Sequence, residues 1–275
     1  MSERQFGIST DIYCTNINTN RINCQDVFAD TLTTNNVDLQ VGGSYKIGGA
    51  HVLSTPVNGS SVSLGNTLSI GQGTNSVAIG TSSGQSSQGQ NSVAIGSLAG
   101  QTTQGQNSVA IGSSAGQTNQ AGFSVAVGNT CGSINQGQGC VAVGLGAAYS
   151  GQGLNSVALG NYASGNGNLD GNSVLAGYHA CLNGAGGNNV VVGSSACANA
   201  VIGTNNTCIG DSISATAGIN DSIVIGAGAV ANASSQFVLA SAAHPLTLVP
   251  TAGPVAGYVF VTLNGQQQKF LLFDP

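Results

Sequence analysis

The sequence predicts an all-β fold, a parallel β-solenoid built from coils of about sixteen residues. Each copy of the repeat contains one strand-like segment, most legibly NSVAIG at Asn75–Gly80. The closing glycine recurs every sixteen residues, at Gly80, Gly96, Gly112, Gly128, Gly144 and Gly160. Gly and β-branched residues are dense throughout and no apolar pattern at helical spacing persists, which excludes helices. A fixed short period of this kind is typical of stacked coils rather than of a globular enzyme core.

Residues 1–42 are expected to form a shaft or an attachment arm. Six apolar residues there lie five positions apart: Ile12, Ile17, Ile22, Val27, Leu32 and Val37. A five-residue step matches neither a helix nor a flat strand, and it fits a narrow intertwined β-structure. It looks like the Thr/Asn-rich shafts of trimeric viral and phage fibres, although an extended arm lying along a partner would keep the same spacing. Residues 43–59 are expected to be a linker.

The solenoid itself, a flattened β-roll, is expected over residues 60–240. Because strand side chains alternate, Val77 and Ile79 point to one side of their strand and Ala78 to the other. Both sides are apolar or small, so we expect burial on both faces, with stacking of the coils covering the Val and Ile side chains. The remainder of each unit, such as SLAGQTTQGQ at Ser97–Gln106, is expected to form turns and a second strand more exposed to water.

The period is less regular toward both ends of the roll. After Gly160 the step lengthens to Gly177, and we expect an inserted turn within Asn166–Asn172 to explain this slip. Irregular or shorter units are expected to end at Gly65, Gly71, Gly203 and Gly210. About eleven coils at roughly 4.8 Å each would give a rod on the order of 50 Å long.

Residues 241–275 are expected to form a C-terminal β-hairpin cap. The apolar runs GYVFVTL and QQQKFLLF flank Asn264-Gly265, a pair suited to a tight hairpin turn because both residues tolerate positive φ. We therefore predict a hairpin over Gly257–Phe273. It would cover unpaired strand edges at the end of the roll, which otherwise favour association; a receptor-binding tip is the functional alternative.

Composition excludes several classes of function. Charged residues make up 5% of the chain, and the four basic ones are Arg4, Arg21, Lys46 and Lys269. So few cations give no footprint for a phosphate backbone, and nucleic acid and anionic membranes are poor partners. No apolar run approaches a membrane span, and the N-terminal MSERQFGIST lacks the basic and apolar regions of a secretory leader, so we expect neither membrane insertion nor export by the usual route.

Seven cysteines are present and none forms a CxxC pair: Cys14, Cys24, Cys131, Cys140, Cys181, Cys197 and Cys208. Cys131 falls where other units have Ala, and Cys140 falls where they have Ser. Most of the cysteines are therefore expected to be small, reduced core residues. The alternative is a disulfide between Cys181 and Cys197, which share a repeat position.

We expect no catalytic, cofactor-binding or metal site, and hence no enzyme. His51, His179 and His244 have no carboxylate or Cys at ligand spacing. The glycine-rich match Gly144-Leu145-Gly146 falls in repeat register and lacks the context of a phosphate loop. Asn166–Asn172 slightly resembles a calcium-binding β-roll turn, but it occurs once, whereas such sites need stacked copies.

NSVAIG followed by a small-residue AG segment resembles the head-domain repeat of trimeric autotransporter adhesins, and related sixteen-residue forms occur in proteins of large DNA viruses and phages. The resemblance covers roughly Ser60–Ala240. It implies a left-handed parallel β-roll that forms a homotrimer. We expect neither a signal peptide nor a C-terminal membrane-anchor barrel, and this expectation favours a virus or phage particle over a bacterial surface.

The expected function is therefore that of a non-enzymatic structural and adhesive protein: a trimeric fibre or spike on the virion surface, assembled in the host cytoplasm. Its rows of Asn, Gln, Ser and Thr would make many weak contacts with a host surface glycan or protein. The N-terminal segment would bind capsid or other virion proteins. Two alternatives stay open, a minor capsid cement protein that docks through its N-terminal arm and a fragment of a bacterial trimeric surface adhesin.

Overall fold

The computed structural model describes residues 44–47, 50–54, 61–65, 70–239, 241, 258–263 and 266–271, all within Leu39–Pro275. Every regular element among them is a β-strand, which confirms the all-β prediction. The five-residue period between Ile12 and Val37 lies outside the described residues.

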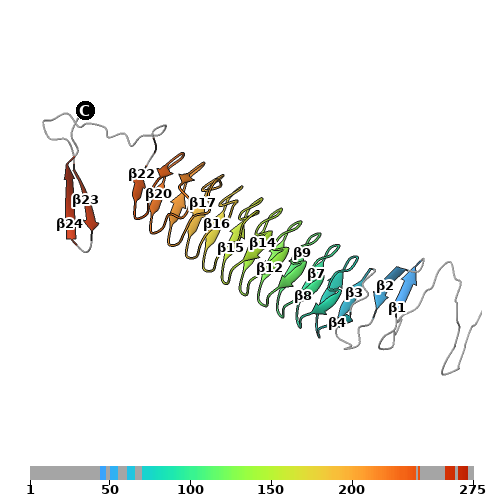
Figure 1. Ribbon diagram of the computed structural model, residues 1–275. Helices are drawn as coiled ribbons and strands as arrows, with labels where there is room; N and C mark the ends of the chain where they lie inside the picture. The colour runs from blue at the N-terminus through green and yellow to red at the C-terminus, as the bar shows by residue number, and fades with distance from the viewer. Residues whose placement is uncertain are drawn as a thin grey trace, which may run out of the picture. The chain divides into compact units, whose positions relative to one another are not determined.

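The larger sheet contains fourteen strands (Figure 1). Its first two strands, β1 and β2, form a hairpin, and each later strand comes from one successive coil. From β3 onward all neighbouring strands are parallel and in register, so that Val109 pairs with Val93 on one side and Val125 on the other. Its strands are β1 (Ser44–Ile47), β2 (Ala50–Ser54), β3 (Val62–Leu64), β5 (Val77–Ile79), β7 (Val93–Ile95), β9 (Val109–Ile111), β11 (Val125–Val127), β13 (Val141–Val143), β15 (Val157–Leu159), β16 (Val174–Ala176), β17 (Val190–Val192), β18 (Thr207–Ile209), β20 (Ile223–Ile225) and β22 (Phe237–Leu239).

A second sheet faces the first and contains the other strand of the first six coils. It consists of β4 (Ile70–Gln72), β6 (Ser86–Gln88), β8 (Thr102–Gln104), β10 (Thr118–Gln120), β12 (Ile134–Gln136) and β14 (Ser150–Gln152). Single parallel bridges continue this wall through Leu169, Ala185 and Ile202. Further on, β19 (Ser214–Ala215) pairs with β21 (Val230–Ala231). Two parallel walls joined by turns confirm the predicted solenoid with coils of about sixteen residues.

Two of the predicted coil ends are wrong. Gly71 lies in β4 of the second wall, and Gly203 follows the bridge residue Ile202 in the same wall. Gly65–Gly80 and Gly193–Gly210 are therefore single coils. The slip after Gly160 does come from an insertion, because Leu169 pairs with Gln152, seventeen positions earlier, where the preceding coils pair at sixteen.

The glycine that closes each strand of the first sheet is required by the backbone. Gly96 has a φ of +126°, a conformation that side chains rarely adopt. A Cβ built on Gly96 would lie 2.6 Å from the carbonyl oxygen of Gly112 in the next coil. Successive coils thus approach one another too closely at this corner for any residue but glycine, which explains the sixteen-residue glycine period.

The buried face of the first sheet is the alanine face. The central residue of each strand points inward and is fully buried: Ala78, Ala94, Ala110, Ala126, Ala142 and Ala158. Val77 and Ile79 are half-buried and lie on the outer side. The prediction that stacking buries the Val and Ile side chains is therefore wrong, because only the smaller side of the strand fits between two walls this close together.

A ladder of glutamines fills the space opposite these alanines. Gln72, Gln88, Gln104, Gln120, Gln136 and Gln152 occupy equivalent positions in the second sheet and are buried. The Gln120 Nε2 donates across the interior to the Val109 carbonyl oxygen at 2.8 Å and along the stack to the Gln136 Oε1 at 3.0 Å. Gln104 Nε2 donates to Gln120 Oε1 at 3.1 Å. These bonds offset the cost of burying the amides.

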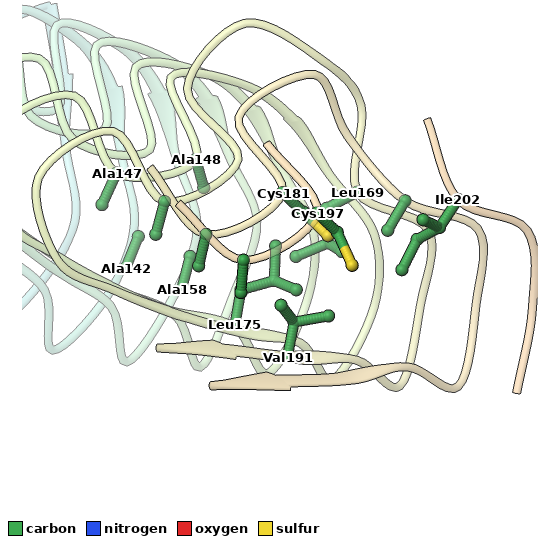
Figure 2. Close-up of a cluster of buried hydrophobic side chains, with 14 of the residues drawn as sticks. Ala142, Ala147, Ala148, Ala158, Leu169, Leu175, Cys181, Val191, Cys197 and Ile202 are labelled. Carbon is green, nitrogen blue, oxygen red and sulfur yellow. The ribbon is translucent and has the colours of Figure 1, made fainter. Parts of the chain in front are cut away.

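Beyond Gln152 the core becomes aliphatic. Leu169, Ala185 and Ile202 follow Gln152 along the second wall, while Leu175 and Val191 take the alanine position in the first. Figure 2 shows this change from alanine side chains to larger ones. In two of these coils the larger side chain changes walls, since Ala158 shares a coil with Leu169 and Leu175 shares one with Ala185. Summed side-chain volume is thereby kept similar between those two coils.

Paired strands also precede and follow the roll in the sequence. β1 and β2 form an antiparallel pair, and β2 joins β3 through Ser54 and Ser63, so the segment expected to be a linker carries two strands of the first sheet. At the other end, β23 (Tyr258–Leu263) and β24 (Gln266–Leu271) pair antiparallel. This confirms the C-terminal hairpin, whose capping role stays a prediction.

Candidate interaction surface

The outer apolar face is the most extended candidate site on the described part of the chain. It consists of the first and third residues of the first-sheet strands β5, β7, β9, β11, β13, β15, β16, β17, β18, β20 and β22. These residues are Val, Ile, Leu or Phe throughout, apart from Ala176 and Thr207. They point outward because the alternate residue of each strand points into the core.

These side chains keep much of their surface in contact with water. Ile111 is 37% exposed near the middle of the stack, and Phe237 is 65% exposed in the last strand of the first sheet. In-register pairing aligns them in two continuous rows that cross every coil. A sheet face that stays in solvent is ordinarily polar, and a large contiguous apolar surface marks an interface.

The other exposed surfaces of the roll are mostly polar, with single exposed apolar residues such as Phe123, Leu154 and Val230. The second sheet turns Ser86, Thr102 and Asn119 toward solvent. At the corner before the first sheet, side chains of successive coils bond to one another: the Nδ2 of Asn75 donates to the Oδ1 of Asn91, and Asn91 donates likewise to Asn107, both at 3.3 Å. The predicted polar rows are present, and the contrast with them makes the outer apolar face distinctive.

The described cysteines are buried and free: Cys131, Cys140, Cys181, Cys197 and Cys208. Cys181 and Cys197 lie next to each other in adjacent coils with their sulfur atoms in the core (Figure 2). The disulfide alternative for this pair is thus wrong, and the prediction of small core residues holds for these five. Cys14 and Cys24 lie outside the described residues.

We expect the buried thiols to resist alkylation in the folded protein. Desolvation raises the pKa of the Cys131 thiol from 9.0 to about 12, which leaves roughly a thousandfold less thiolate at pH 8. The pKa of Cys197 also rises to about 12, chiefly through its hydrogen bond with Cys181. Iodoacetamide labelling followed by peptide mass spectrometry should leave both unmodified in buffer and modify both in guanidinium. Rapid labelling of Cys131 in buffer would contradict this burial.

The structure does not gather the other chemistry-bearing residues into a metal centre. Among the described residues no group of three His, Cys, Asp or Glu side chains could hold a metal ion, and no helix is long and apolar enough to cross a membrane. His51 lies in β2, His179 stacks on Tyr178, and His244 falls outside the described residues. Gly144 and Gly146 occupy a coil corner, as expected from their register.

The sequence matches no protein-family profile and no curated protein.

Proposed function

We propose that this chain is a non-enzymatic structural protein of a virus or phage particle, a homotrimeric fibre or spike that attaches the particle to a host surface. The observation that carries the proposal is the outer apolar face. It runs along the whole stack of coils, and a lone chain would leave it in water.

Association of identical chains would cover this face efficiently. Every coil places two outward residues at the same two positions, and nearly all of them are apolar, so parallel copies packed around a common axis meet apolar rows at every level. The choice of three copies comes from the resemblance to trimeric adhesin heads. The polar second sheet and the Asn corner would then remain outside and be available for contact with a host surface.

Native mass tests the oligomer. We expect light scattering to give about 81 kDa, three times the 26.9 kDa chain. The double substitution Val109→Glu and Ile111→Glu should reduce this to the mass of one chain, because it places two charges in the interface. The matched control, Thr102→Glu with Thr103→Glu, adds the same charges to the exposed second sheet and should leave the mass unchanged. A wild-type mass near one chain would refute the trimer.

Immunogold labelling of intact particles tests the role of the oligomer. Label on projecting tips supports the fibre. Label that appears only after the shell is opened would refute attachment and favour the capsid cement, which would dock through residues 1–42.

A further inference from the structure

An aromatic cluster interrupts the small polar residues at one corner of the roll. The two positions after the strand-closing glycine are mostly small and polar, as in Ser113-Ser114 and Ser194-Ser195. In the coil that follows Gly177 they are Tyr178 and His179, and in the coil before it the second position is Tyr162. With aromatic residues at 5% of the chain, three ring-bearing side chains in two adjacent coils form a local concentration.

The rings of Tyr162, His179 and Tyr178 pack against one another in that order. A Cβ on Gly146 would lie 2.6 Å from the Cε1 of Tyr162, so the Tyr162 ring lies over the bare backbone of Gly146 in the preceding coil. His179 packs edge-on against Tyr162 with ring centroids 6.0 Å apart. Tyr178 in turn stacks on His179 at 3.8 Å and stays 51% exposed. The outermost ring is therefore held in place by packing before any ligand arrives.

Polar side chains lie on both sides of this ring along the stack. The His179 amide donates to the Asn161 carbonyl and the Ser195 amide to the Tyr178 carbonyl, which places Asn161 and Ser194 in the coils on either side of Tyr178. Both are exposed, as is Asp211 one coil further on. At the coil spacing of about 4.8 Å, an amide and a hydroxyl thus lie one coil away on either side of the aromatic ring, and a carboxylate lies two coils away.

This combination suits a neutral sugar. The C–H groups of a hexose face pack on the negative face of an aromatic ring, while its hydroxyls need amide, hydroxyl or carboxylate partners. No Lys or Arg occurs between Lys46 and Lys269, so a sialylated or sulfated ligand would find no cation on the roll, and Asp211 would repel it.

We infer that Tyr178, bordered by Asn161 and Ser194, binds neutral hexose units of a surface glycan. This inference rests on the proposed attachment function, because it names the ligand class and the residues that contact it. In an oligomer the site would be repeated on each chain, so weak single contacts would add up.

An array of neutral lactose-type oligosaccharides and their sialylated counterparts tests this site on the full chain. We expect the neutral probes to bind and the sialylated ones to bind no better. Tyr178→Ala should weaken binding by about tenfold or more, and Tyr178→Phe, which keeps the ring, should retain most of it. Phe123→Ala removes an equally exposed ring elsewhere on the roll and should have no effect. Circular dichroism confirms that each variant is folded.

The outcomes separate this inference from the proposed function. Failure of every neutral probe to bind, or binding that survives Tyr178→Ala, overturns the sugar site, even if light scattering of the same sample gives a trimer. Exclusive binding to a protein ligand also overturns it. Neutral sugar binding that depends on Tyr178 in a monomeric chain supports the site and refutes the trimeric fibre.

Discussion

Gly96→Ala is expected to destabilise the roll by about 4 kcal/mol or more. The backbone at Gly96 has a φ of +126°, so any side chain is strained there whatever the space around it. The new methyl group would also meet the carbonyl oxygen of Gly112 at 2.6 Å, which forces adjacent coils apart and weakens the hydrogen bonds between them. Thermal unfolding followed by far-ultraviolet circular dichroism, at fixed protein concentration, measures the loss.

Gly218→Ala is the matched control for this experiment. Gly218 also has a positive φ, +76°, but no atom lies within 4 Å of a Cβ built there. Its cost should be confined to backbone strain, about 1 kcal/mol. Equal melting temperatures for the two variants would show that the close contact between Gly96 and the next coil does not add to the loss of stability.

Gln120→Glu is expected to cost about 3 kcal/mol or more at pH 7.5, although it preserves the shape of the side chain. The Gln120 Nε2 donates to two acceptors, the Val109 carbonyl and the Gln136 Oε1. A carboxylate would place negative charge against both of these oxygens in a buried site. Gln106→Glu adds the same charge at an exposed position and should change stability by less than about 0.5 kcal/mol.

The destabilisation by Gln120→Glu should depend on pH. Burial and the two facing oxygens raise the pKa of the introduced carboxyl above its ordinary value of about 4.3. The stability loss is therefore greatest above the raised pKa and shrinks as pH falls toward 4.3, because the protonated acid can again donate a hydrogen bond. Guanidinium unfolding at pH 7.5 and pH 5 checks this trend. A small loss, similar to that of Gln106→Glu at both values, would mean that the carboxyl reaches water.

The repeat was predictable because the same constraints recur in every coil. Gly96 and its equivalents meet a backbone requirement that the neighbouring coil imposes, and Asn75 and Asn91 adopt positive φ at the corner before the strand. The Asn264-Gly265 hairpin followed from turn chemistry of the same kind. The predicted coil ends at Gly71 and Gly203 were wrong because Ile70-Gly71 and Ile202-Gly203 resemble the last two residues of SVAIG. Both pairs lie in the opposite wall.

The buried side of the strand was not predictable from alternation alone. Val77 and Ala78 are both acceptable core residues, and the choice depends on how closely the second wall approaches. The glutamine column contained the missing signal, since Gln88, Gln104 and Gln120 recur every sixteen residues beside the turn. Their regular recurrence indicates a fixed partner, here a carbonyl across the interior. The sugar site depends on ring packing between coils, which no single repeat reveals.

The glutamine ladder has a consequence for how this chain can vary. Each coil between Gly80 and Gly160 packs an alanine and a glutamine against the equivalent residues of both neighbouring coils. If a whole coil is deleted or duplicated there, the coils that become neighbours make the same contacts as before. Beyond Gln152 each coil is fitted to one particular neighbour. In-frame duplication or deletion of a whole coil should therefore be tolerated between Gly80 and Gly160 and not beyond Gln152. The length of the roll can change in whole-coil steps only within the first of these two regions.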